Sequence, residues 1–360
     1  MATEVERTIG AAGDHANVAI WEGVTDTDLV SSDTIEIGIM IDASHTDDRA
    51  IIAGGTVDAT RYRILRASDA QYHGMQIGGG GVWASSTGTE HIVLTQDHFR
   101  LQGVEMTQGA SQSTSDEIIR LEGENATTVY IQRCILHGMD TDNQDGLYDR
   151  RTTSHTINIE NCLFWNCQQG GVTIDSASSI TVTVNVKNCT FYDCGGNAGD
   201  GCLIGKAGTA GMTIIFNVTN TLAHAGTSGS CFVDAGEAGT VEFNGVNVIG
   251  SDATCDTKIN GGVFENSSTG LLPSEAFGDG TASGVLFVSL TASSEDFHLK
   301  DHANNVAIDA GAFTTLDEGA IDAELDSRPG SGDWDCGWDE TDYGAGPALT
   351  ANQGWLWSHN

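Results

Sequence analysis

The sequence predicts an all-β fold in which short parallel strands wind into a solenoid. The first observation is a repeat: INIENCLFWNC (157–167) has a near copy, VNVKNCTFYDC (184–194), and further copies begin at Phe99, Val129, Phe216 and Val241. Secondly, apolar and polar residues alternate inside the copies, which is typical of strands. Thirdly, no helical pattern separates the copies, so each coil should stack about 4.8 Å from the last.

Alignment of the copies places equivalent residues in columns. One column holds Val104, Cys134, Cys162, Cys189, Thr221 and Val246, at steps of 25 to 32 residues. One position earlier stand Gly103, Arg133, Asn161, Asn188, Asn220 and Gly245. Short apolar strands fall between the copies, at 118–121, 147–148, 172–174, 203–204, 232–233 and 263–264. Inward columns should form a core, and asparagines at turns should hydrogen-bond along the axis.

The repeat also gives an interpretation of the cysteines. Cys162 and Cys189 share a column, which favours small, buried core thiols. Cys162 and Cys167 are five apart and would face opposite sides of a continuous strand, so we expect a turn between them. Their spacing exceeds the two to four residues usual between zinc ligands. Disulfides and a metal site remain as alternatives to the thiol column.

Composition restricts the partners. The chain has 15 Lys and Arg against 50 Asp and Glu, a net charge of −35 at pH 7. Such acidity repels nucleic acid and anionic membranes, and it favours solubility, cation binding or a basic partner. No apolar run is long enough to span a bilayer, so we expect no membrane insertion. The segment MATEVERTIG lacks the features of a signal peptide, so we expect mostly reduced thiols.

Two terminal segments extend the pattern. DFHLKDHANNVAIDAG (296–311) and LDSRPGSGDWDCGWDE (325–340) carry a terminal motif at Asp296, His298, Ile308, Asp309, Gly311, Arg328 and Pro329. With the repeat, these segments and RTIGAAGDHANVAIWEGV (7–24) make the chain resemble right-handed parallel β-helix proteins of the pectate-lyase-like superfamily. The similar members are bacteriophage virion and environmental bacterial proteins. The resemblance implies a single-stranded right-handed parallel β-helix with an N-terminal helical cap and a C-terminal closing module.

The expected organisation has four parts. Residues 1–35 hold the cap and first strands, 36–295 the parallel β-helix, 296–345 the closing module and 346–360 a tail. In the cap, Asp14 or Asn17 is the expected N-cap of a short helix, and Val18 and Trp21 should cover the open core. The motif implies that Arg328 bonds to carboxylates or carbonyls of the last coil.

One acidic segment carries the candidate chemistry. In MDTDNQDGLYD (139–149), Asp140, Asp142 and Asp145 crowd around a glycine and are candidate ligands for calcium, which prefers several oxygens from one loop. The alternative is an acidic surface turn. If the protein is an enzyme, Asp145, Asp149 and Arg150 are the candidate catalytic residues, with a solvated arginine pair as the alternative. Calcium is the one cofactor we consider.

The tail offers a partner contact. Trp355, Leu356 and Trp357 are costly to expose, so they either pack back on the flank or dock into a neighbouring subunit.

The functional prediction follows from the resemblance and from missing catalytic motifs. We expect a structural bacteriophage virion protein, an exposed head-decoration or spike protein on the virion with a glycan-adhesive surface. Its partners would be other virion proteins and surface polysaccharide, and the resemblance implies a homotrimer. The alternative is a tailspike-type polysaccharide depolymerase, a lyase or glycoside hydrolase, so the question of enzymatic activity stays open while we lean toward none.

Overall fold

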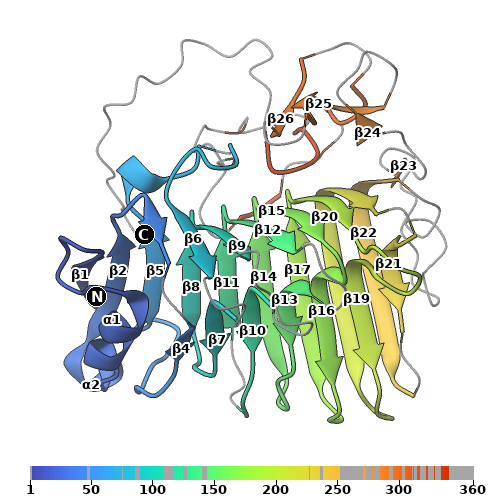
Figure 1. Ribbon diagram of the computed structural model, residues 1–360. Helices are drawn as coiled ribbons and strands as arrows, with labels where there is room; N and C mark the ends of the chain where they lie inside the picture. Colours follow the sequence, from blue (N-terminus) through green and yellow to red (C-terminus); the bar gives the residue numbers. More distant parts are fainter. Residues whose placement is uncertain are drawn as a thin grey trace.

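The computed structural model is a parallel β-solenoid of about 8 turns, which confirms the predicted all-β fold. Coils stack side by side from the N-terminal strands to β22 (Figure 1). The structure describes residues 2–46, 49–74, 76–85, 90–108, 117–124, 128–139, 144–226, 228–235, 238–251, 271–272, 277–278, 284–291, 295–301, 305–309, 311, 314–316, 322, 328 and 334–339.

Each coil passes three faces in turn. Face 1 contains β1 (Thr3–Ile9), β2 (Thr34–Met40), β5 (Arg63–Ala67), β8 (Phe99–Gln102), β11 (Thr128–Gln132), β14 (His155–Glu160) and β17 (Thr181–Lys187). Face 2 contains β3 (Ser44–His45), β6 (Val82–Ser85), β9 (Glu105–Gln108), β12 (Ile135–Met139), β15 (Leu163–Cys167), β18 (Thr190–Cys194) and β23 (Leu271–Leu272). The long strands β20 (Thr213–Ala225) and β22 (Thr240–Gly250) run across both, which joins them into one 16-stranded sheet.

Face 3 is a separate 7-stranded sheet. It contains β4 (Ala50–Ile52), β7 (Ile92–Leu94), β10 (Ile119–Leu121), β13 (Asp145–Asp149), β16 (Gly170–Ser176), β19 (Gly201–Ala207) and β21 (Ser230–Asp234). Its register aligns Ile119, Leu147, Val172, Leu203 and Phe232. The predicted second set of apolar strands is therefore confirmed, except for 263–264, which lies outside the described residues.

The core is built from like residues stacked in register. One inward column on face 1 runs through Leu65, Leu101, Ile131, Ile159, Val186 and Val218, all within one buried cluster. The rings of Phe164 and Phe191 stack with centroids 4.7 Å apart. Since successive coils repeat the same apolar positions, the apolar core is continuous along the axis.

The short turn from face 1 to face 2 explains the asparagine column. Its first residue has positive φ in successive coils, at Gly103, Arg133, Asn161, Asn188, Asn220 and Asn247. Asparagine tolerates this left-handed conformation better than most residues. The amides also form a ladder, since Asn220 Nδ2 donates to Asn188 Oδ1 (3.0 Å) and Asn247 Nδ2 to Asn220 Oδ1 (3.2 Å).

In the last copy the predicted alignment was wrong by two residues. Thr221 pairs with Val248, and Gly245 and Val246 lie earlier, on the face 1 part of β22. Strand alternation allows slips of two without exposing the core, so hydrophobic pattern alone could not fix this register.

The cysteines that the structure describes are thiols, as the column interpretation predicted. The eight within the described residues are free and buried. Burial raises the pKa of the Cys134 and Cys162 thiols. Cys162 and Cys167 both face the core because Asn166, at φ 52°, interrupts the alternation between them.

Helices α1 (Val18–Thr25) and α2 (Leu29–Ser32) lie beside the first coils. Asn17 is the N-cap of α1, its side chain accepting from the Ile20 amide at 2.9 Å, while Val18 and Trp21 join the core. The buried Arg63 guanidinium donates to the carbonyl of Thr25 at the end of α1 (2.6 Å).

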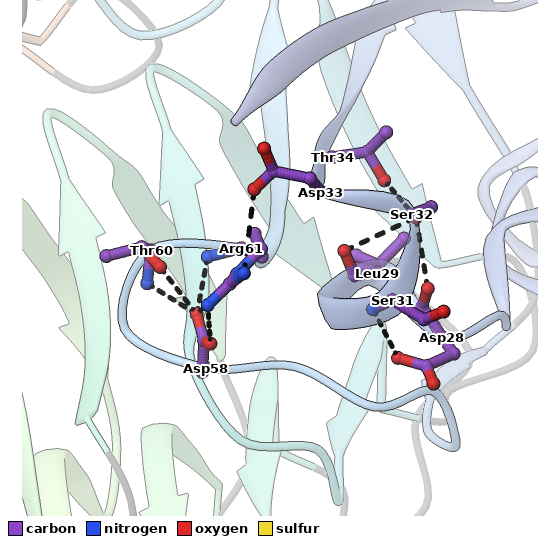
Figure 2. A network of polar contacts seen from close by, with 9 residues as sticks. All are labelled: Asp28, Leu29, Ser31, Ser32, Asp33, Thr34, Asp58, Thr60 and Arg61. Atoms are coloured by element: carbon purple, nitrogen blue, oxygen red, sulfur yellow. Dashed lines mark hydrogen bonds and ion pairs between the residues drawn. The ribbon is translucent and has the colours of Figure 1, made fainter. Parts of the chain in front are cut away.

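A polar network fixes the end of α2 (Figure 2). Asp28 caps the helix by accepting from the Ser31 amide, and Asp33 ends it in a left-handed conformation. Arg61 pairs with Asp33 (3.5 Å) and with Asp58. Hydrogen bonds from Arg61 and Thr60 lower the pKa of Asp58 within the turn from 58 to 61.

The described C-terminal residues pack along the flank of the solenoid. Strands β24 (Phe277–Gly278), β25 (Val285–Ser289) and β26 (Asp296–Leu299) form a small sheet beside face 2 (Figure 1). Phe287, Phe297 and Trp338 cover outward apolar residues of face 2, at Ile135, Leu163, Leu222 and Ile249. Arg328 donates to the carbonyls of Asp335 and Gly337, which belong to this segment itself.

Candidate functional site on the outer side of face 3

A shift in the side-chain alternation of β13 separates the two predicted catalytic carboxyls. Leu147 belongs to the core, yet a Cβ on Gly146 would also lie 2.7 Å from the core ring of Phe164. Two successive residues therefore face inward. Asp145 turns to the outer side, where its Oδ1 accepts from Thr173 Oγ1. Asp149, two residues after Leu147, faces the interior.

Asp145 belongs to an acidic column. Glu90, Glu117 and Asp145 each stand two residues before the aligned Ile92, Ile119 and Leu147, at equivalent positions of successive coils, and all are buried (5%, 7% and 0% exposed). Like charges at strand spacing repel one another. Arg120 relieves this repulsion at one end by pairing with Glu90, Glu117 and also Glu122.

At Asp145 the repulsion between carboxylates is reduced by protonation instead. Burial, together with the Glu117 and Asp200 carboxylates, raises its pKa to about 8 against the opposing hydrogen bond from Thr173. At neutral pH the carboxyl is therefore mostly neutral and holds a proton that it can donate. Glycoside hydrolysis uses such a carboxyl as general acid, with a second carboxylate at a set separation. Asp145 is fully buried, so this proton does not face solvent.

Asp149 forms an interior corner with His155. The imidazole Nε2 lies 2.9 Å from Asp149 Oδ2, and Nδ1 lies 2.7 Å from the Thr153 carbonyl. Since a carbonyl only accepts, Nδ1 must donate to Thr153. The adjacent Arg151 guanidinium donates to the Gln96 carbonyl (3.0 Å). These contacts join three coils and explain why charged groups stand inside the solenoid.

The other predicted residues are placed as follows. Arg150 is exposed, and its guanidinium carbon lies 6.0 Å from the Tyr148 ring centroid. Asp140 and Asp142 lie outside the described residues, as do Trp355, Leu356 and Trp357. Among the residues that are described, no group of three or more His, Cys, Asp or Glu is arranged to hold a metal ion. Calcium therefore stays a prediction.

Sequence reasoning missed Arg120, Tyr148 and Asp175 on this side of the sheet. The Tyr148 hydroxyl donates to Asp175 Oδ2 at 2.8 Å. It also missed Glu90 and Glu117, although the signal for them was present, because Glu90, Glu117 and Asp145 are separated by 27 and 28 residues, which is the interval of the repeat.

Comparison with known proteins gives no relative: no family model, curated protein or solved structure matches the chain. In the described part of the chain, no helix combines the length and apolar character required to cross a membrane.

Proposed function

We propose that this chain is a structural bacteriophage virion protein, an exposed head-decoration or spike protein with a stiff, glycan-adhesive body. The observation that carries the proposal is the unbroken stack of about 8 turns over one continuous core. Every coil is hydrogen-bonded to its neighbours, so bending or local opening breaks several bonds and exposes apolar surface. Such a body suits a part that must persist outside a cell.

The partners belong to the same proposal. Other virion proteins would anchor the rod, and Trp355, Leu356 and Trp357 are the proposed contact. A homotrimer is expected from the resemblance to virion β-helices. The acidic surface, with a net charge of −35, keeps copies apart on a particle and disfavours contact with packaged nucleic acid.

Labelling of intact particles tests the proposal. Antibodies against the chain should decorate purified particles from the encoding phage in electron micrographs, and mass spectrometry should find many copies per particle. Particles that lack the chain would contradict the proposal. Trp355→Ala with Trp357→Ala should reduce the copies per particle, whereas Arg150→Ala, an exposed change elsewhere, should leave them unchanged.

A depolymerase is the second candidate, favoured by one observation. Asp145 lies on the outer side of face 3 with a raised pKa, as a general acid would, and a substrate would have to displace the residues that bury it. A reducing-sugar assay on bacterial capsule polysaccharide separates the two candidates. Turnover that disappears in Asp145→Asn and persists in Asp175→Asn would replace the structural proposal with an enzymatic one.

A further inference from the structure

The outer side of face 1 carries a column of amides that is separate from the asparagines of the turn. Asn158, Asn185, Asn217 and Asn244 are in register. Each of the last three donates from Nδ2 to Oδ1 of the asparagine one coil before, at 2.8, 2.9 and 3.1 Å. An amide has two N–H groups and two acceptor lone pairs, so the ladder uses only half of each central amide.

A threonine column runs beside the amides. Thr128, Thr156 and Thr183 are in register, and Thr156 and Thr183 stand two residues before Asn158 and Asn185 on the same side of their strands. These side chains are half-buried, so their outer edges face solvent. Two hydroxyl and amide pairs, Thr156 with Asn158 and Thr183 with Asn185, therefore lie one strand spacing apart, about 4.8 Å. Ile215 takes the threonine position in the next coil.

The N-terminal end of the amide column is aromatic and basic. Arg100 and Tyr130 precede Asn158 in the same column. The guanidinium carbon of Arg100 lies 5.0 Å from the Tyr62 ring centroid and 4.2 Å from that of Tyr130. Two rings hold this side chain in one position, which reduces the entropy lost when it binds a ligand. A shallow depression of about 40 Å³, lined in part by Tyr62 and Arg100, adjoins the sandwich.

The chemistry of this surface selects its ligand. From Asn158 to Asn217 its central columns carry no charge, and two neighbouring ion pairs balance their own charges, Arg66 with Glu6 (2.8 Å) and Lys187 with Glu160 (3.4 Å). In the last coil Glu242 stands two residues before Asn244, so the uncharged part of the surface ends there. Among the exposed large apolar side chains of the described residues, Val246 is the one on face 1, whereas a protein interface needs an apolar centre. A polymer of hydroxyl-bearing units fits this surface, because it can bond to uncharged donors and acceptors and needs no apolar centre. Its units should repeat at about the spacing of neighbouring strands.

We propose that the outer side of face 1 binds a neutral polysaccharide, lying along the solenoid axis with about one sugar per coil. The amides and threonines bond to its hydroxyls, and the Tyr62–Arg100–Tyr130 sandwich contacts one end of the bound segment. This inference rests on the glycan-adhesive part of the proposed function and names its site and ligand class.

Native gels cast with polysaccharide test the site. The probes are dextran, laminarin and xyloglucan, which are neutral, and polygalacturonate, which is anionic. At least one neutral probe should retard the full chain. Asn185→Ala with Asn217→Ala should weaken that binding about tenfold, as expected for two lost hydrogen bonds. Thr183→Val, which keeps shape and strand propensity, should weaken it about threefold.

Controls separate the outcomes. Asn197→Ala, an exposed asparagine outside face 1, should bind like the unaltered chain, and equal melting temperatures should exclude misfolding. Retardation by polygalacturonate alone, by no probe, or equally in all variants would overturn the inference. A change of mass in light scattering for the double variant would instead assign face 1 to contact between copies. Particles that carry the chain without any retardation would leave the virion proposal standing.

Discussion

Replacement of Asn188 by alanine should destabilise the solenoid through two separable effects. Asn188 is fully buried at φ 49° in the turn between β17 and β18, and its Oδ1 accepts from Asn220 Nδ2 at 3.0 Å. Alanine in the left-handed region costs about 1–2 kcal/mol. Removal of the buried acceptor costs about 1–3 kcal/mol more. The free energy of unfolding should therefore fall by about 2–5 kcal/mol.

Urea denaturation of two variants measures both effects. Asn188→Gly also removes the acceptor but adopts positive φ without strain, at an entropic cost of about 0.5–1 kcal/mol. Alanine should therefore be the more destabilising of the two, by up to about 1 kcal/mol. Equal stability of the two variants, or greater stability of alanine, would refute the claim that the turn imposes a left-handed residue in each coil.

Three further predictions concern the core, the flank and the outer side of face 3. Phe191→Ala, which removes a buried ring stacked on Phe164, should cost about 3–5 kcal/mol in urea denaturation, and a cost below 1 kcal/mol would contradict tight stacking. Burial lowers the pKa of His73 to about 4, so the unfolded chain binds more protons below pH 6.5; stability should fall from pH 6.5 to about 4, and this loss should shrink in His73→Gln. The raised pKa of Asp145 has the opposite sign: stability should fall as pH rises from about 4 through 8, and a denaturation series should find this slope removed in Asp145→Asn but unchanged in Asp175→Asn.

Much of the fold could be predicted because each coil of a solenoid repeats the same strand pattern and the same packing as the coil before it. The interval between INIENCLFWNC and VNVKNCTFYDC is the length of one coil, and the residues that recur in it, Cys162 and Cys189, lie one above the other. The alternation of apolar and polar residues along each strand then identified the side chains that face the core. The last copy failed because a slip of two residues preserves the same alternation, so only the pairing of Thr221 with Val248 settles it.

The flank could not be predicted, because the pattern there looks like an ordinary core strand. Ile135 and Leu163 alternate with inward residues and should have been exposed. They are covered by Phe297 and Trp338, which lie more than a hundred residues further along the chain. No local rule connects segments that far apart.

The candidate site, too, could be predicted only in part. Sequence reasoning found Asp145 and Asp149 but grouped them, since both stand near one glycine. The structure places them on opposite sides of β13, because Gly146 faces Phe164 and shifts the alternation by one residue. Such a shift depends on which side chain packs against the glycine. The periodicity of a strand carries no information about that contact.

By itself the sequence determined the coil length, the apolar columns, the buried thiols and the asparagine turns, because these depend on residues one coil apart and on local conformational preference. Only the tertiary structure decided which face is covered by the C-terminal segment, which carboxyls share a column and which side of β13 each one occupies. Those features arise from contacts between distant segments, whose packing is selected by shape and burial rather than by any periodic signal.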